Sequence, residues 1–367
     1  SGTTGFSKGV ITPANALAGN ILFGFKTGLV YPGCRHVAFL PLAHAYGCAF
    51  DFLACLAAGG HTHLIGRTPS PKILMKAFAE VKPTLILSVP LILEKIYKKM
   101  IQPQISRTAV SWVLKMPLLD KVVLNKIRET LVNAFGGEFS EIIIGGAPLN
   151  AEVEAFLKRL KFPLTVGYGM TETAPLISFA HWDKFKSQSC GQVLDGLMEV
   201  RIASPDGDGV GEIQVRGEHV MLGYYKNEQA TKESFTEDGW LRTGDLGTVD
   251  ADGFIYIKGR CKTMLLGASG QNIYPEEIEA KINNMPYVLE SLGLQKDTKL
   301  VALVCPDFEA VDADHLTQTQ LEVLMEENRK LVNQQLATYE QINEIRIFNH
   351  EFEKTPKKSI KRFLYEA

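Results

Sequence analysis

The sequence predicts an α/β protein with a large domain built on a mixed or parallel sheet, an antiparallel β subdomain and a smaller α+β domain at the C-terminal end. Three observations support this prediction. Over residues 39–217, short apolar runs alternate with helical patterns, which is typical of a parallel α/β sheet. Over residues 198–257, alternating polar and apolar residues lie between turn signals and indicate antiparallel strands. Beyond residues 259–262, helix and strand patterns begin again.

In the first region, apolar runs at residues 37–40, 85–87 and 142–144 predict buried strands, each followed by a turn and a helix. The clearest helix follows the third run, where Asn150 can cap the N-terminus. One apolar face of this helix comprises Val153, Phe156, Leu157 and Leu160.

In the last region, Pro275 begins a predicted helix with the sequence PEEIEAKI. The elements expected after it are a strand at residues 301–305, a long helix near residues 316–336, a strand at residues 344–348 and a basic tail at residues 353–365.

The composition is that of an ordinary soluble protein, with 367 residues, of which 46% are hydrophobic and 22% charged. The formal net charge of −2 argues against a nucleic-acid partner, which would favour a basic excess. The most apolar segment, residues 48–59, is interrupted by Asp51 and is too short to span a bilayer.

Six cysteines are scattered along the chain, without CxxC pairs or nearby histidine ligands. We expect reduced, mostly buried thiols in a cytoplasmic protein, and neither disulfides nor a zinc site. They are Cys34, Cys48, Cys55, Cys190, Cys261 and Cys305.

The chain opens on a loop rich in Ser, Thr and Gly, SGTTGFSKGV. Its glycines allow a close backbone approach, its hydroxyls and amides can surround an oxyanion, and Lys8 adds a charge suited to phosphate. A flexible, tag-like terminus is the alternative interpretation. Because no strand precedes the loop and no initiator Met is present, we expect the C-terminal part of a longer polypeptide.

Five further segments follow in the order LPLAHAYG, GGAPL, YGMTET, WLRTGD and IKGRCKTMLLGASGQNIYPEEIE. With the opening loop they resemble the adenylate-forming superfamily of acyl-CoA synthetases, peptide-synthetase AMP-binding domains and luciferases. The resemblance runs from Ser1 to Arg362. Several of its sequence stretches are most similar to those of bacterial long-chain fatty acid–CoA ligases. It implies a ligase that uses ATP, Mg²⁺ and CoA to convert a fatty acid to acyl-AMP and then to acyl-CoA.

The resemblance assigns the phosphates and the metal to two motifs. Thr171 corresponds to a catalytic residue that contacts the α-phosphate, and Glu172 to the catalytic carboxylate that helps to hold Mg²⁺, a cation that prefers oxygen ligands. The loop that holds the β- and γ-phosphates corresponds to Ser1, Gly2, Thr3, Thr4, Gly5 and Lys8.

The same resemblance places the rest of the nucleotide and the acyl group. Tyr168 would stack on adenine, with Gly169 beside it, and Asp245 would accept hydrogen bonds from both ribose hydroxyls. Arg260 would reach ribose or phosphate, and His44 would lie near the acyl carboxylate. The loop whose backbone runs along adenine corresponds to Gly145, Gly146, Ala147 and Pro148.

Lys262 corresponds to the family's hinge, which divides a large domain of residues 1–261 from a mobile lid domain of residues 262–367. One face of the lid would carry the catalytic lysine. The other face, with the loop around Gly270, would open a channel for the CoA thiol. A change in the backbone angles of a few residues is enough for such a rotation.

The tail departs from the family pattern, because strict register places Ser359 where a catalytic lysine is expected. Among the neighbouring lysines, Lys357, Lys358 and Lys361, the first substitute is Lys358. Solvated surface charge is the alternative interpretation of all three.

Three functions stay open: a fatty acid–CoA ligase, an acyl-AMP ligase that loads acyl carrier protein, and a nucleotide-binding module without catalysis. Residues 102–134 lie where relatives build a wall of the acyl pocket. They suggest either an interfacial helix, peripheral to the inner face of a membrane, or a helix packed on its own domain.

Overall fold

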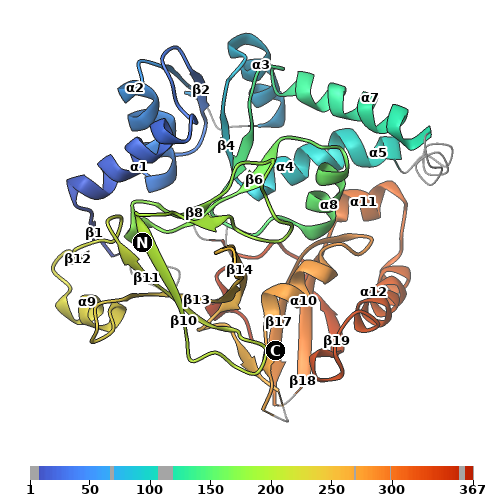
Figure 1. Cartoon of the computed structure of the whole chain (residues 1–367). Helices are drawn as coiled ribbons and strands as arrows, with labels where there is room; N and C mark the ends of the chain where they lie inside the picture. The colour runs from blue at the N-terminus through green and yellow to red at the C-terminus, as the bar shows by residue number, and fades with distance from the viewer. Residues whose placement is uncertain are drawn as a thin grey trace.

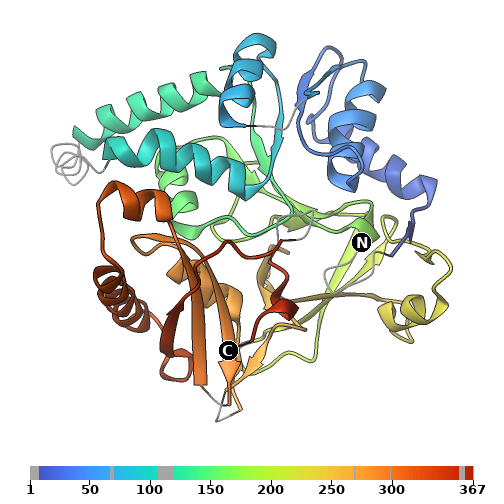
Figure 2. The same ribbon diagram turned by 180° about the vertical axis from the view of Figure 1, so that it is seen from behind.

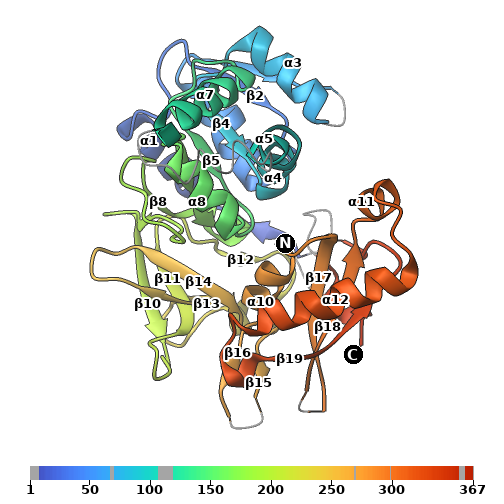
Figure 3. The same cartoon turned by 90° about the vertical axis from the view of Figure 1, so that its right-hand side faces the viewer.

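A computed structural model describes residues 8–66, 70–105, 119–267, 270–297, 299–354 and 360–366 (Figure 1). We call residues 8–260 the body and the described residues of 265–366 the C-terminal module. Figure 3 shows the module against the lower side of the body, beside the antiparallel strands that precede it in the chain.

A parallel sheet forms the centre of the body, in the order β4 (Ile86–Ser88), β5 (Ile142–Ile144) and β6 (Leu164–Val166). The parallel pair β2 (Arg35–Ala38) and β3 (His61–Leu64) extends it, because the amide of Thr84 donates to the carbonyl of Arg35 over 2.8 Å. These strands confirm the α/β fold class. The apolar residues of β2, β4, β5 and β6 are buried, as expected for a parallel sheet between helices, whereas Leu64 of β3 is exposed.

Helices cover this sheet, and local signals set several of their ends. Asn150 accepts hydrogen bonds from the amides of Glu152 (3.0 Å) and Val153 (3.2 Å), so the predicted cap of α8 is confirmed. The helices are α1 (Ala14–Lys26), α2 (Cys55–Ala57), α3 (Pro71–Val81), α4 (Pro90–Ile96), α5 (Gln102–Ile105), α7 (Leu119–Ala134) and α8 (Ala151–Arg159), with π-helical turns η1 (Gly47–Ala54) and η2 (Tyr97–Ile101).

Helix α7 bears on one of the two alternatives for residues 102–134, a helix packed on its own domain. Leu124, Ile127 and Leu131 are buried in the same core as the central sheet, so α7 packs on its own domain. Residues 106–118, which include Lys115, lie outside the described residues. Membrane contact by this stretch stays a prediction.

The antiparallel subdomain follows, with strand order β10 (Met198–Ala203), β11 (Gly211–Gly217), β13 (Leu241–Val249) and β14 (Ile255–Arg260). Smaller elements connect it to the central sheet. They are β7 (Tyr168–Gly169), η3 (Thr171–Thr173), β8 (Leu176–Phe179), β9 (Gln192–Val193), α9 (Glu228–Ser234) and the pair β1 (Val10–Ile11) and β12 (Gly223–Tyr224).

The C-terminal module has its own core beneath a three-stranded sheet, in which β18 pairs antiparallel with β17 and parallel with β19. Figure 2 shows the tail returning across this sheet. Its elements are β15 (Leu265–Leu266), β16 (Asn272–Ile273), α10 (Pro275–Ile282), β17 (Val288–Lys296), β18 (Lys299–Pro306), α11 (Phe308–Ala313), α12 (Gln318–Asn333), η4 (Thr338–Glu340), β19 (Ile342–Ile347) and η5 (Arg362–Leu364).

Side-chain hydrogen bonds join the body to the chain that follows it. Asp206 accepts from Asn272 (3.2 Å) and Tyr274 (3.3 Å), and Lys258 pairs with Glu277 at 2.9 Å. Within the parts of the chain that the structure describes, no helix has both the length and the apolar character that crossing a membrane requires.

Candidate functional site

The candidate site lies where parallel strands end, the edge at which α/β sheets bind ligands. β2 leads to the segment that contains His44, β5 leads to the GGAP loop, and β6 leads to Tyr168. A Cβ on Gly145 would lie 3.2 Å from the ring of Tyr46, whose hydroxyl donates to the Ile143 carbonyl over 3.0 Å. Glycine at position 145 therefore lets two of the predicted motifs contact each other.

Asp245 is the first of two buried carboxylates at the site, and it is only 4% exposed. The Tyr168 hydroxyl donates to its Oδ2 over 2.6 Å, and Nε of Arg260 lies 2.9 Å from its Oδ1. Arg260 faces Asp245 across the β13–β14 pair and is itself half exposed. A carboxylate has about four acceptor positions, so these two contacts leave room for hydroxyl donors from a ligand.

Burial raises the pKa of Asp245 above its ordinary value, while Arg260 and the Tyr168 hydroxyl act in the opposite direction. Glu276 and Glu172 raise it further through their negative charges.

Glu172, the second buried carboxylate, is 3% exposed and lies in the short helix η3. The Tyr224 hydroxyl donates to its Oε1 over 2.8 Å, and the Met221 amide donates to its carbonyl over 2.8 Å. Burial, followed by the Glu172 charge, raises the pKa of Tyr224 to about 12, so the phenol stays protonated and donates.

Lys8 reaches the same place from the start of the chain. β1 pairs with β12, and the Tyr225 amide donates to the Gly9 carbonyl over 2.8 Å. The Lys8 ammonium lies 4.3 Å from the centre of the Tyr224 ring, within cation–π range. A cation from the predicted phosphate loop therefore lies beside the tyrosine that holds Glu172, while Ser1, Gly2, Thr3, Thr4 and Gly5 lie outside the described residues.

These residues fit a magnesium nucleotide. Buried carboxylates favour a cation, and Mg²⁺ takes oxygen ligands. Arg260 and Lys8 supply positive charge suited to the anionic part of the nucleotide.

The other predicted nucleotide and acyl residues differ in how far they are buried. Thr171 and His44 are half-buried, and the His44 amide donates to the Pro41 carbonyl over 2.9 Å. A Cβ on Gly169 would lie 2.1 Å from the Pro175 carbonyl oxygen, so packing alone requires glycine there. The exposed loop residues are Gly146, Ala147 and Pro148.

The predicted hinge and channel residues lie on turns. Lys262 is exposed in the turn after β14, and Gly270 is exposed between β15 and β16 with φ +84°. Lys361 pairs with Glu353 at 3.2 Å. Lys357, Lys358 and Ser359 lie outside the described residues.

One expectation from the sequence is wrong. A histidine does lie near two cysteines, because the ligand atoms of Cys34, His36 and Cys55 are all within 4.8 Å of one another. Residues 34 and 36 share one face of an extended segment, and this spacing of two was the available signal. Cys55 joins them only through the fold. Tyr224 was also missed, since only the β1–β12 pairing and the contact with Glu172 reveal its position.

The motifs, their order and the fold together define an adenylate-forming type of protein. The family model described as AMP-binding enzyme matches residues 1–225, and the chain belongs to this family.

Curated relatives are long-chain-fatty-acid–CoA ligases. FadD15 of Mycobacterium bovis is 33% identical over 339 residues, which cover 85% of this chain and 54% of that protein. Human ACSBG1 is 28% identical over 347 residues, covering 87% of this chain and 47% of that protein. The chain thus spans about half the length of the curated relatives it matches.

Solved structures share the fold. An ATP-bound RpMatB-BxBclM chimera superposes with a TM-score of 0.77 and 25% identity, covering 99% of this chain and 66% of that one. O-succinylbenzoate coenzyme A synthetase from Bacillus subtilis, in complex with AMP, gives a TM-score of 0.75 and 23% identity, covering 100% of this chain and 68% of that one.

Proposed function

We propose that the protein is an ATP-dependent fatty acid–CoA ligase. A fatty acid carboxylate attacks the α-phosphate of ATP to give acyl-AMP and pyrophosphate. The CoA thiol then attacks the acyl carbonyl to give acyl-CoA and AMP. The names of the curated relatives support the fatty acid and CoA, and the ATP- and AMP-bound structural neighbours support the nucleotide.

The observation that carries this proposal is the presence of two buried carboxylates, Glu172 and Asp245, in the predicted nucleotide motifs. Each is almost fully buried, and each is held by a tyrosine hydroxyl. Positive charge lies close to both, from Arg260 at Asp245 and from Lys8 over the Tyr224 ring. A site that brings a carboxylate to a polyphosphate requires this combination of metal ligand, ribose acceptor and cations.

In this function Asp245 accepts hydrogen bonds from the ribose hydroxyls, with Tyr168 and Arg260 fixing its orientation. Glu172 holds Mg²⁺, which when bound neutralises charge on the phosphates. Lys8 and Arg260 offset the repulsion between the incoming carboxylate and the phosphates. His44 and Thr171 are the residues we assign to the acyl carboxylate and the α-phosphate.

The test is ATP–pyrophosphate exchange by the protein at its natural length, across a series of carboxylic acids. We expect exchange that depends on a fatty acid and on Mg²⁺. Product analysis with CoA and with acyl carrier protein then identifies the thiol acceptor. Exchange that no carboxylic acid stimulates would contradict the proposal.

We further propose that residues 1–261 and 262–367 are separate domains with a hinge at Lys262. The exposed turn at Lys262 and the separate hydrophobic core of the module support this proposal. Lys262→Pro fixes φ and should preserve one half-reaction while abolishing the other. Lys262→Ala, which removes the charged side chain without fixing φ, is the control. Equal loss of both half-reactions in a folded Lys262→Pro protein would count against the hinge.

The tail favours a second candidate, a nucleotide-binding protein with weak or no catalysis, because Ser359 stands in the register of the catalytic lysine. If Lys358 substitutes for it, Lys358→Ala should abolish pyrophosphate exchange and spare thioester formation from supplied acyl-AMP. If instead Lys358→Ala is silent and Ser359→Lys raises exchange about a hundredfold, the chain lacks its catalytic lysine.

A further inference from the structure

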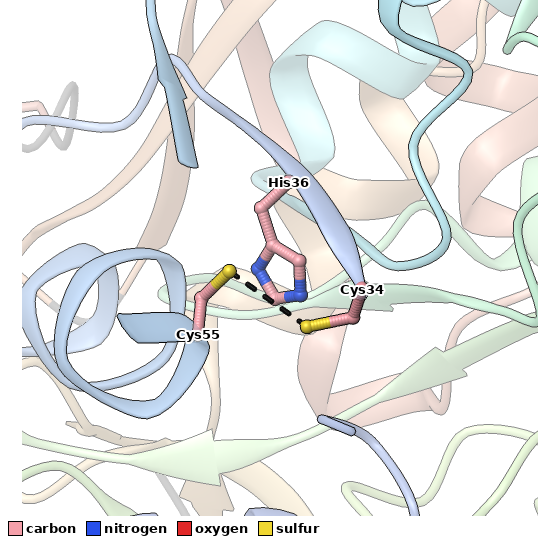
Figure 4. Close-up of side chains that lie close together, drawn as sticks. All are labelled: Cys34, His36 and Cys55. Atoms are coloured by element: carbon pink, nitrogen blue, oxygen red, sulfur yellow. Dashed lines mark hydrogen bonds between the residues drawn. The ribbon is translucent and has the colours of Figure 1, made fainter. Parts of the chain in front are cut away.

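A second polar cluster lies in the body, separate from the residues assigned to nucleotide or fatty acid. It consists of Cys34, His36, Asp51 and Cys55, and none of these side chains is more than about 1% exposed. Cys34 and His36 come from the start of β2, Asp51 from η1 and Cys55 from α2. Figure 4 shows the two sulfurs and the imidazole turned toward one another.

The cluster contains a buried ion pair, His36 with Asp51, whose polar atoms make no close hydrogen bond with the described residues. Nδ1 of His36 lies 3.4 Å from Oδ1 of Asp51, yet neither ring nitrogen and neither carboxylate oxygen makes a hydrogen bond with the described residues. A buried polar group left in this way destabilises a protein by about 1–3 kcal/mol. Such groups in native proteins often have an ion or a water as the missing partner.

We propose that Cys34, His36 and Cys55 bind a zinc ion. Two thiolates that each lie about 2.3 Å from one tetrahedral zinc are about 3.8 Å apart. The sulfurs of Cys34 and Cys55 are 3.8 Å apart. The two sulfurs and one imidazole nitrogen of His36 all lie within 4.8 Å of one another, which is short enough for them to share one ion.

Asp51 lies where its carboxylate can orient the imidazole of His36. Zinc-bound histidines almost always donate their other ring N–H to a carboxylate, carbonyl or water. Because Nδ1 of His36 faces Asp51, Nε2 is the nitrogen left for the metal. Two cysteines and one histidine are a known zinc ligand set, with the fourth position open to a small ligand such as water.

Zinc explains the cluster better than the two simplest alternatives. A Cys34–Cys55 disulfide would use both sulfurs but leave His36 with the Asp51 carboxylate at 3.4 Å as its only charged partner in the cluster. Magnesium would not select thiolates, which favour softer cations. On binding, the two thiols release their protons to water and Zn²⁺ takes their place, with no change in oxidation state.

The position suggests a structural role. β2 runs from this cluster directly toward His44, so the ion would fix the start of the strand that leads into the candidate acyl site. A Cβ on Gly60 would lie 2.5 Å from the Cys34 sulfur and 2.8 Å from the Cys55 sulfur. The absence of a side chain at position 60 therefore lets the next strand close over the sulfurs.

Metal analysis of the protein, purified under reducing conditions without chelators, tests the proposal. We expect one zinc per chain. Protein refolded with Co²⁺ in place of zinc should show the visible absorption of tetrahedral cobalt and a sulfur-to-cobalt charge-transfer band. Cys34→Ser and Cys55→Ser should lose the metal and the band. Cys305→Ser, a change at an equally buried free cysteine in the C-terminal module, should keep both.

Asp51→Asn keeps the shape of the side chain and should weaken zinc binding about 10–100-fold without abolishing it. If the cysteine variants fail to fold, the zinc affinity of Asp51→Asn still tests the site. The proposal is overturned if reduced wild-type protein holds no zinc and refolding with Co²⁺ gives no tetrahedral spectrum. It is also overturned if mass spectrometry of rapidly alkylated protein finds a Cys34–Cys55 disulfide in place of the metal.

Discussion

The two buried carboxylates of the candidate site and Glu279 of the C-terminal module are satisfied in different ways. In the body, Asp245 and Glu172 accept from tyrosine hydroxyls, and Asp245 also pairs with the half-exposed Arg260. In the module, Glu279 pairs with Arg362 at 2.6 Å and accepts from the Gly293 amide over 2.6 Å. Arg362 also donates to the Gly293 carbonyl, which closes the group within the module.

This difference helps to distinguish buried charges that can bind a ligand from those that stabilise the fold. A carboxylate with neutral donors and an exposed cation still has unused acceptor capacity. A carboxylate paired with an arginine that also donates to a backbone carbonyl ties two segments together, here α10 and the tail. Substitutions in the two regions should therefore affect different measurements.

The largest effect is expected at Glu172. Glu172→Gln keeps the size of the side chain but removes the charge that we assign to Mg²⁺, so adenylation should fall by about 10²–10³-fold while the fold persists. The measurement is ATP–pyrophosphate exchange over a magnesium titration. Glu218→Gln, at an exposed glutamate of the body, should match wild type. A Glu172→Gln protein that exchanges at the wild-type rate would refute the assignment.

A smaller effect is expected at Asp245. Asp245→Asn removes a charged acceptor, and a hydrogen bond to a charged group contributes about 1.5–3 kcal/mol. AMP affinity measured by calorimetry should fall about tenfold or more, with fatty-acid affinity little changed. Asp252→Asn, in an exposed turn nearby, is the control. Unchanged AMP binding by Asp245→Asn would exclude the ribose role.

The smallest effect on the nucleotide site is expected from Glu279. Burial raises the pKa of Glu279 to about 7, against the opposing influence of Arg362. The pKa of Glu279 is thus higher in the folded protein than the unfolded value of 4.5. Its protonated form therefore stabilises the fold fully below pH 4.5, and this stabilisation is lost as the pH rises through about 7.

Glu279→Gln should therefore flatten the dependence of the free energy of unfolding on pH between about 4.5 and 7, and leave AMP affinity unchanged. Denaturant titrations at several pH values measure the first effect. If Glu279→Gln instead weakened AMP binding as much as Asp245→Asn does, the proposed division between the two regions would fail.

Local signals allowed much of the fold to be predicted from the sequence. The strand at Ile142–Ile144, the Asn150 cap and the helix that begins at Pro275 all lie where the sequence predicts them. Each depends on neighbouring residues: a β-branched run, a capping side chain, and a proline suited to the first helical turn.

Long-range pairing could not be predicted in this way. The π-helical turn at Gly47–Ala54, the Glu172–Tyr224 hydrogen bond and the approach of Cys55 to Cys34 all depend on tertiary packing. The motifs identified Glu172 and Asp245 as candidates. Only the fold revealed that each is buried and held by a tyrosine.

The pairing of β1 with β12 has a consequence for synthesis of the protein. Val10 finds its partner at Tyr224, more than half the chain away. A ribosome that adds about 5–20 residues per second needs roughly 10–40 s to pass from one to the other. Throughout that interval the nascent chain carries Lys8 without the strand that positions it. ATP can therefore bind in the proposed manner, and stabilise the newly made protein, only after Tyr224 has left the ribosome.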